Sequence, residues 1–364
     1  MAAGRPGALG GLTADLAVVG AGAIGLATAL AAADRGARAV VVERERPGGG
    51  QSGGPGRIFR HITDSPERVA LAMRARAAWR AAEERLGSPL LGGRGALLVG
   101  DPADHAARLA EAGLAHEVLD GPGVRAALPL LGPWPREGLL DVDGGVIDAE
   151  AYVTGVAGLL GDAIQPGAVT GLRAEGDGIA LEGTEVRARR VLVAAGAGAV
   201  ELGPRLGLEL PIRVAVHHRV AFGPVAGAGG LPCLLERSDL AGPRCYGLPL
   251  PGGGAYAIGV GAFDDRSQED GVAATAAHAT AALPGLGPER RGVVRCASTI
   301  LAGDPENFGL YPADPPGAAV FAGGNLFKFA PLLGELLADA LLEDRIDPAL
   351  APPRIERAGR PRPA

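Results

Sequence analysis

The apolar positions near the N-terminus change from strand-like to helix-like spacing and back. An apolar run over 16–19 predicts a β-strand, a helix of small residues follows and stops near Gly36, and a second apolar run ends at Glu43. A strand, a helix and a second strand in this order form a βαβ unit, which builds parallel sheets. We therefore expect an α/β fold that begins with a parallel sheet.

Later segments extend this sheet and pack on it. The apolar runs at 190–200 and 317–325 each end in glycine, as strands do that complete a parallel sheet after an inserted domain. The segment 66–87 has helical periodicity. One face of this helix is predicted from four apolar positions: Val69, Met73, Ala77 and Leu86.

The middle of the chain has a different pattern, with short strand-like runs separated by glycine and proline. Runs at 219–225, 245–251 and 254–263 predict a mostly antiparallel sheet in a second domain. The first domain is expected at about 1–86, 146–214 and 305–346. The second, substrate-binding domain is expected at 87–145 and 215–304. The tail at 347–364 is rich in proline and arginine and is predicted to be disordered.

Composition and charge exclude several classes of partner. The net charge of -6 leaves no basic stripe for nucleic acid or an anionic membrane. The N-terminus does not resemble a signal peptide, and no apolar run reaches the ~18 residues of a membrane span, so a cytoplasmic protein is expected. The odd number of cysteines, three, has no metal-ligand spacing and predicts neither disulfides nor a metal site. His217 and His218 are adjacent and are predicted to be structural.

Three glycines in the βαβ unit carry the first chemical signal. Gly20 permits a tight turn, Gly22 lets a pyrophosphate approach the helix N-terminus, and Gly25 lets the helix and strand pack closely. Glu43 can accept both ribose hydroxyls of an adenosine. The pattern predicts a Rossmann-like dinucleotide site. A nicotinamide enzyme would usually continue with further βα units, whereas here a glycine-rich stretch follows, which favours a flavin.

The order of the motifs resembles one family of flavoproteins. Those motifs are the three glycines with Glu43, QSGGPGRIFRH at 51–61, DGGVIDAEAYV at 143–153, RCYGLPLP at 244–251, RCAST at 295–299 and FAGGNLFKF at 321–329. The chain is similar over nearly its whole length to the monomeric sarcosine oxidase and N-methyl amino acid oxidase branch of the D-amino acid oxidase-like flavoproteins.

The resemblance implies a two-domain FAD enzyme that oxidises the C–N bond of a secondary or cyclic amino acid to an imine. Electrons would pass to O2 and give H2O2, and a monomer is favoured. Two alternatives stay open at this point. One is a flavin-dependent amine dehydrogenase with another electron acceptor, and the other is a flavin-binding protein without catalysis.

The resemblance assigns the catalytic positions to four side chains. Lys328, the only lysine beside 34 arginines, and Arg60 would together bind the substrate carboxylate by charge-assisted hydrogen bonds. Arg57 would lie near the flavin ring and stabilise its anionic reduced form. Tyr246 would line the substrate cavity, although an ordinary strand aromatic remains an alternative.

The cofactor positions implied by the resemblance are more numerous. They are Gly20, Gly22, Gly25, Glu43, Arg44, Ser52, Arg57, Gly196, Cys296, Gly323, Gly324, Asn325 and Lys328. Cys296 would join FAD through its sulfur, whereas composition alone favours an inert core cysteine.

Three departures from the family pattern bear on function. The lysine that assists oxygen activation in the family falls at Ala257, and a family histidine falls at Gly261. The turn before Lys328 is about two residues shorter than in the family. Small residues in place of large ones suggest a roomier cavity, suited to a bulkier or cyclic amine, such as an intermediate of secondary metabolism.

Overall fold

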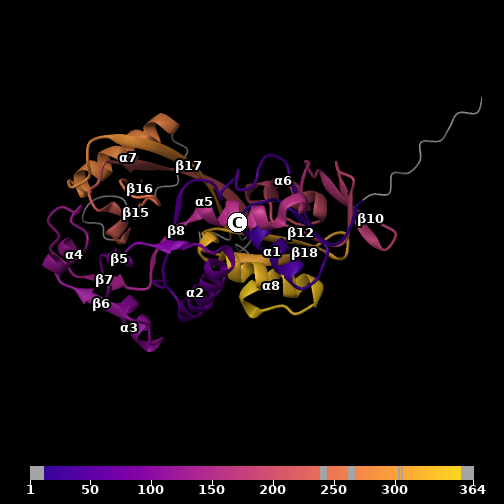
Figure 1. The fold of residues 1–364 in the computed structure, drawn as a ribbon, viewed down its shortest axis with the longest axis horizontal. Coiled ribbons are helices and arrows are strands. Elements are labelled where there is room, and N and C mark those ends of the chain that lie inside the picture. The colour runs from indigo at the N-terminus through magenta and orange to yellow at the C-terminus, as the bar shows by residue number, and fades with distance from the viewer. Residues whose placement is uncertain (1–11, 238–243, 261–266, 302–303, 305, 354–364) are drawn as a thin grey trace, which may run out of the picture.

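The computed structural model describes residues 12–237, 244–260, 267–301, 304 and 306–353. Figure 1 shows two lobes. One lobe combines segments from both ends of the chain, drawn in indigo and yellow, and the other contains segments from its middle.

The first sheet contains the predicted βαβ unit. β1 (Leu12–Val19) pairs in parallel with β2 (Ala39–Glu43), and α1 (Ala23–Asp34) connects them. On its other side β1 pairs in parallel with β12 (Val186–Val193), which pairs in parallel with β19 (Ala318–Gly323). The prediction that later strands complete a parallel sheet is confirmed.

Shorter strands extend this sheet at its edges. β9 continues the parallel part beside β2, whereas the others pair in antiparallel fashion. These strands are β9 (Ile164–Pro166), β10 (Gly171–Glu175), β11 (Gly178–Glu182) and β18 (Phe308–Ala313). β2 and β19 are buried along nearly their whole length and read as continuous apolar runs, whereas β1 and β12 do so only in their C-terminal halves.

Helices pack together on this sheet around one large apolar cluster. α1 lies against α5 (Ala149–Leu160) and α8 (Ala330–Leu342), and α8 also contacts α2 (Pro66–Leu86). α2 begins after Ser65, whose hydroxyl caps it.

The face of α2 that is buried differs from the predicted one. Met73 and Ala77 are exposed. The buried positions are Val69, Leu71, Ala72, Ala75, Ala78 and Trp79. The prediction gave weight to Met73, but the alanines of this helix form the closer contact, and Trp79 is the largest fully buried side chain.

The second sheet has eight strands and is mostly antiparallel, as predicted. Among its described strands, β14 and β5 pair in parallel and the remaining neighbours are antiparallel. In spatial order the strands are β17 (Arg290–Leu301), β13 (Ile212–Phe222), β16 (Tyr256–Val260), β15 (Cys245–Pro249), β14 (Cys233–Glu236), β5 (Ala96–Val99), β7 (Gly138–Asp141) and β6 (His116–Leu119).

Smaller elements complete the fold. A three-stranded sheet consists of β3 (Gly56–Phe59), β8 (Gly145–Asp148) and β4 (Leu91–Gly92). The remaining α-helices are α3 (Ala103–Glu111), α4 (Gly121–Ala127), α6 (Ala199–Leu202) and α7 (Gln268–Ala282). α7 covers one face of the second sheet, over β13 and β16 (Figure 1).

The C-terminal segment differs in part from its prediction. Pro348–Leu350 forms a 3-10 helix, and Leu350 is fully buried, so disorder does not begin at 347. Residues 354–364 lie outside the described part of the chain, and the domain boundaries remain a prediction. No helix within the described ranges is long and apolar enough to cross a membrane.

Candidate functional site

A cavity of about 870 Å³ lies between the carboxyl ends of β1, β2 and β12 and the inner face of the second sheet. Ligands of open α/β sheets bind at this edge. Most of the predicted site residues line it: Gly20, Gly22, Glu43, Arg44, Ser52, Arg57, Arg60, Gly196, Tyr246, Cys296, Gly323, Asn325 and Lys328. The predicted Gly25 and Gly324 do not.

At two of the predicted glycines, Gly20 and Gly25, a side chain would clash with the backbone. Gly20 has φ +105°, and a Cβ there would lie 2.7 Å from the carbonyl oxygen of Ala194. A Cβ on Gly25 would lie 2.0 Å from the carbonyl oxygen of Gly20. Gly25 thus acts on the cavity indirectly, because it lets α1 approach the turn that the cavity uses.

The N-terminus of α1 fits the pyrophosphate of a dinucleotide. Gly22 caps the helix without any side-chain hydrogen bond, which leaves the cavity side of the turn open. Ser52 accepts the Ala23 N–H at 2.9 Å, and Glu43 accepts the Ala21 N–H at 2.7 Å. The Glu43 carboxylate keeps further lone pairs for ribose hydroxyls.

Arg57 is held rigidly by the backbone around it. Its Nη1 donates to the carbonyl oxygen of Gly56 at 2.7 Å, and Nη2 donates to those of Gln51, at 2.8 Å, and Gly53. The guanidinium also lies 5.5 Å from the centre of the Phe327 ring. Burial, together with the charge of a second arginine, lowers the pKa of Arg57 to about 10, so it stays charged at neutral pH.

The two predicted carboxylate-binding cations converge. Arg60 directly follows β3, and Lys328 lies in the 3-10 helix η5 (Phe327–Phe329); both form an ion pair with Oε1 of Glu306. The Lys328 Nζ distance is 3.3 Å. Arg68 adds a third cation, 3.6 Å from Oε2. Glu306 also lines the cavity.

Burial and charge set the protonation of this cluster. Burial alone would raise the pKa of Glu306, but Arg60, Lys328 and Arg68 outweigh it and lower that pKa to about 2. Burial and the neighbouring Arg60 lower the pKa of Lys328 to about 7 despite Glu306. Glu306 is therefore ionised at neutral pH, whereas Lys328 loses its proton near pH 7.

The opposite wall of the cavity is the inner face of the second sheet. His217 of β13 is the cross-strand partner of Cys296 in β17, and paired residues share a face. Tyr246 of β15 accordingly reaches His217, with Oη 2.8 Å from Nε2. A Cβ at Gly259 of β16 would lie 2.4 Å from the Tyr246 ring, so glycine makes room for it.

The two adjacent histidines lie on opposite faces of β13. His217 lines the cavity, whereas His218 is buried on the other face, against Gly271 of α7. Burial, then Arg219 and Arg57, lower the pKa of His217 to about 4. Its imidazole is therefore uncharged at neutral pH.

Several cavity residues were not predicted from the sequence, among them Glu306, His217 and Arg219. Arg219 is 3% exposed and donates from Nη1 to the carbonyl oxygen of Gly56 at 2.7 Å. The alternation of β13 places His217 and Arg219 on one face, so knowing which face is inward would have revealed both. No local pattern around Glu306 points to the cavity.

The structure shows where two of the three departures from the family pattern lie. Ala257 is 1% exposed in β16 and packs in a small apolar cluster. Gly261 lies outside the described residues. The shorter turn still places Lys328 in the cavity wall beside Arg60.

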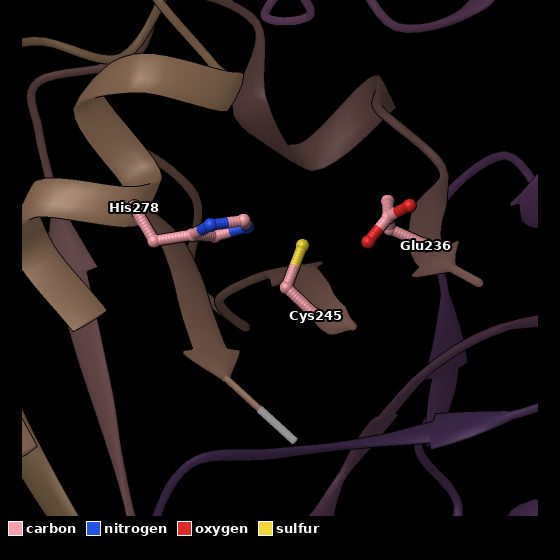
Figure 2. A group of neighbouring side chains, drawn as sticks. All are labelled: Glu236, Cys245 and His278. Carbon is pink, nitrogen blue, oxygen red and sulfur yellow. The ribbon is translucent and has the colours of Figure 1, made fainter. Parts of the chain in front are cut away.

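A second group of polar side chains lies on the far face of the second sheet. Glu236 and Cys245 are cross-strand partners, and His278 of α7 covers them; Figure 2 shows the Cys245 sulfur between the other two. Their donor atoms lie within 4.8 Å of one another. Within the part of the chain that the structure describes, the group offers three donors, fewer than the four of structural zinc sites. Burial and Glu236 raise the pKa of Cys245 to about 12, which opposes metal binding.

Comparison with known proteins gives a consistent picture. Residues 15–340 match the family model described as DAO, FAD dependent oxidoreductase. The chain is 28% identical to monomeric sarcosine oxidase of Streptomyces avermitilis, over 91% of this chain and 94% of the relative. It is also 28% identical to N-methyl-L-tryptophan oxidase of Salmonella arizonae, over 94% and 98%.

Solved structures agree in fold. The open form of NikD, an unusual amino acid oxidase essential for nikkomycin biosynthesis, superposes with a TM-score of 0.82 and 25% identity, over 94% of this chain and 98% of that one. L-proline dehydrogenase from P. horikoshii gives 0.80 at 18% identity, over 93% and 96%. The latter likeness concerns the fold alone.

Proposed function

Because the chain belongs to the family of FAD-dependent oxidoreductases, we propose that it oxidises the C–N bond of a secondary or cyclic amino acid to an imine. O2 takes up the electrons and becomes H2O2. FAD supplies the hydride acceptor for such a reaction. The residues of this chain bind the cofactor, orient the amino acid and exclude water.

The convergence of Arg60 and Lys328 carries the proposal. Both cations pair with one oxygen of Glu306 inside the cavity that contains the dinucleotide turn, and this arrangement supports the binding of a substrate carboxylate beside them. Lys328 and Arg60 still have hydrogen-bond donors that Glu306 does not use and that a substrate carboxylate can accept. Lys328 uses one of its three donors on Glu306, and Nη1 of Arg60 has no partner among the described residues.

The remaining cavity residues take complementary roles in this proposal. Glu43 binds the adenosine ribose, and the open turn at Gly20 and Gly22 binds the pyrophosphate. Arg57, fixed by backbone carbonyls, provides positive charge near the flavin ring. Cys296, which lines the cavity, forms the covalent link to the cofactor in this proposal.

Ala257 favours a second candidate, a flavin-dependent amine dehydrogenase with an acceptor other than O2. The resemblance places an oxygen-activating lysine at this position, and alanine supplies no charge there. The dehydrogenase shares every cofactor and substrate residue, so the two candidates differ in the acceptor only. Rapid anaerobic bleaching of the flavin, with no H2O2 formed after air is admitted, would favour the dehydrogenase.

One experiment tests the proposal. The purified yellow protein is mixed anaerobically with N-methyl and cyclic amino acids, and loss of the visible flavin band is recorded before air is admitted and H2O2 is assayed. We expect bleaching by at least one amino acid and a Kd for it about tenfold higher in Lys328→Met. Arg213→Met, an exposed position on β13, is the control. A protein that no amino acid bleaches would be a flavin-binding protein without this activity.

A further inference from the structure

Arg60, Lys328 and Glu306 form one end of the cavity, here called the carboxylate corner. The opposite wall contains a hydrogen-bonded pair, His217 and Tyr246, that the proposed function does not yet use. We propose that His217 is a positioning residue for the amine nitrogen of the substrate. Its Nε2 accepts the hydroxyl proton of Tyr246, so that the phenol oxygen accepts the N–H of an uncharged secondary amine. This inference rests on the proposed function and adds an amine subsite to its cavity.

The geometry fixes the position of the Tyr246 phenol oxygen, but not that of its proton. The His217 and Tyr246 rings meet edge to face, with centroids 5.8 Å apart and planes at 78°. The phenol ring packs over Gly259, where even a Cβ would lie 2.4 Å from it. The hydroxyl group can still rotate about its C–O bond, and the imidazole 2.8 Å away decides where its proton points.

Charged neighbours keep the imidazole able to accept that proton. Among the described residues, the groups close to His217 on the cavity side include Arg219 on its own strand, Arg57 from β3, Tyr246 from β15 and Cys296 from β17, while His218 acts from the opposite face of β13. Burial and the two guanidinium groups lower its pKa to about 4, so one ring nitrogen carries no proton at neutral pH. Burial raises the pKa of Tyr246, which therefore remains a phenol. A phenol is the better donor and an imidazole the better acceptor, which sets the direction of the bond.

The same charges select the uncharged form of the amine. Glu150 acts on Arg57 from a distance, but no carboxylate among the described residues forms an ion pair with Arg57 or Arg219, so the charge of this wall is mainly positive. An ammonium group beside it would be repelled. A neutral amine donates its N–H to Tyr246 and keeps its lone pair, which stabilises the positive charge that develops as the C–N bond becomes an imine.

The test compares two ligands that differ in the N–H group. One is the amino acid that bleaches the FAD-loaded protein most effectively, and the other is its ether analogue, methoxyacetate in the case of N-methylglycine. Dissociation constants come from anaerobic rapid mixing for the amino acid and from calorimetry for the ether. Tyr246→Phe and His217→Leu should each raise the Kd of the amino acid about tenfold and change the Kd of the ether less than about twofold.

A conservative variant separates positioning from a merely structural role. His217→Gln places an amide oxygen near the former Nε2 and should restore most of the amino acid affinity. Equal weakening of both ligands, or no rescue by glutamine, would overturn the inference. Tyr311→Phe and His116→Leu change the same residue types outside the cavity and should alter neither constant.

Failure of the amine subsite can be distinguished from failure of the proposed function. If no amino acid bleaches the wild type, the proposed function itself is wrong. If the wild type is bleached and Tyr246→Phe binds the amino acid as tightly as the wild type, only the amine subsite is wrong.

Discussion

The Lys328 ammonium lies 3.3 Å from Oε1 of Glu306, the same oxygen that pairs with Arg60. One internal carboxylate thus holds together the two cations that the sequence assigns to a substrate carboxylate. Lys328 is 5% exposed and Arg60 8% exposed, so neither could be buried here cheaply without that counter-charge.

Glu306→Gln should therefore lower the free energy of unfolding by roughly 3–5 kcal/mol, because it leaves buried cations without their carboxylate. Urea denaturation of the FAD-loaded wild type and variant measures this difference. The matched control is Glu343→Gln, which removes an exposed ion pair with Arg345 and should cost less than about 1 kcal/mol.

The effect of Glu306→Gln should also depend on pH. Since the folded protein lowers the pKa of Glu306 from 4.5 to about 2, its contribution to stability is complete above the unfolded value and is lost as the pH falls toward 2. A stability difference between wild type and variant that is small at neutral pH, or that grows in acid, would contradict this account.

Carboxylate binding should weaken as the pH rises through about 7, where Lys328 loses its proton. The sign follows from the lowered pKa of a basic group: below it the ammonium attracts the ligand, and above it the neutral amine does not. Calorimetric titration with methoxyacetate, which is ionised throughout this range, measures the profile. Lys328→Met should give weak binding that is flat near pH 7, and an unchanged profile in that variant would exclude Lys328.

The parallel sheet could be predicted well because the segments 16–19, 39–42, 191–193 and 318–322 at its centre are buried and therefore continuously apolar. Lys328 and Arg60 were predicted through the resemblance, with Lys328 also marked by its rarity among basic residues. Glu306 could not be predicted, since it is one acid among many and its contact with Arg60 spans 246 residues. For His217, the two faces of β13 were distinguishable from sequence, but which of them faces the cavity depends on the sheet's packing.

Helix α2 shows a different limit of sequence reasoning. Apolar spacing assigned Met73 to the core, but the structure buries a face of alanines around Trp79 instead. Small residues allow α2 to approach its neighbours closely, and a hydrophobicity pattern gives them too little weight.

Gly25→Ala should abolish stable cofactor binding, because its Cβ would lie 2.0 Å from the carbonyl oxygen of Gly20 and displace the turn. The retained flavin per chain, measured from the visible spectrum, checks this. Gly158→Ala in α5 is the control. Nothing lies within 4 Å of its Cβ position, so it should keep full flavin and gain up to about 1 kcal/mol from helix propensity.

Cys296→Ser should release the flavin from the polypeptide while leaving the cavity intact. Acid precipitation of the wild type should leave yellow colour in the pellet, and the same treatment of the variant should leave it in the supernatant. Cys245→Ser, on the other face of the sheet, should behave as the wild type. Equal pellet colour in wild type and Cys296→Ser would exclude this cysteine as the attachment site.

The purified protein should contain no stoichiometric zinc. Glu236, Cys245 and His278 are the three donors that the structure gathers, and the raised pKa of the thiol disfavours the thiolate that zinc requires. Elemental analysis by mass spectrometry checks this. One zinc per chain that disappears in Cys245→Ser would show that the cluster is a metal site.

Trp79 donates its indole N–H to the carbonyl oxygen of Lys328 at 2.7 Å and stacks with Phe327. The backbone that carries the single lysine is thereby tied to one of the two tryptophans in the chain. Any movement of Lys328 on ligand binding changes the surroundings of an indole, so this corner of the cavity contains its own fluorophore. With Trp134 replaced by phenylalanine, the emission of Trp79 becomes an optical signal for occupancy of the carboxylate corner.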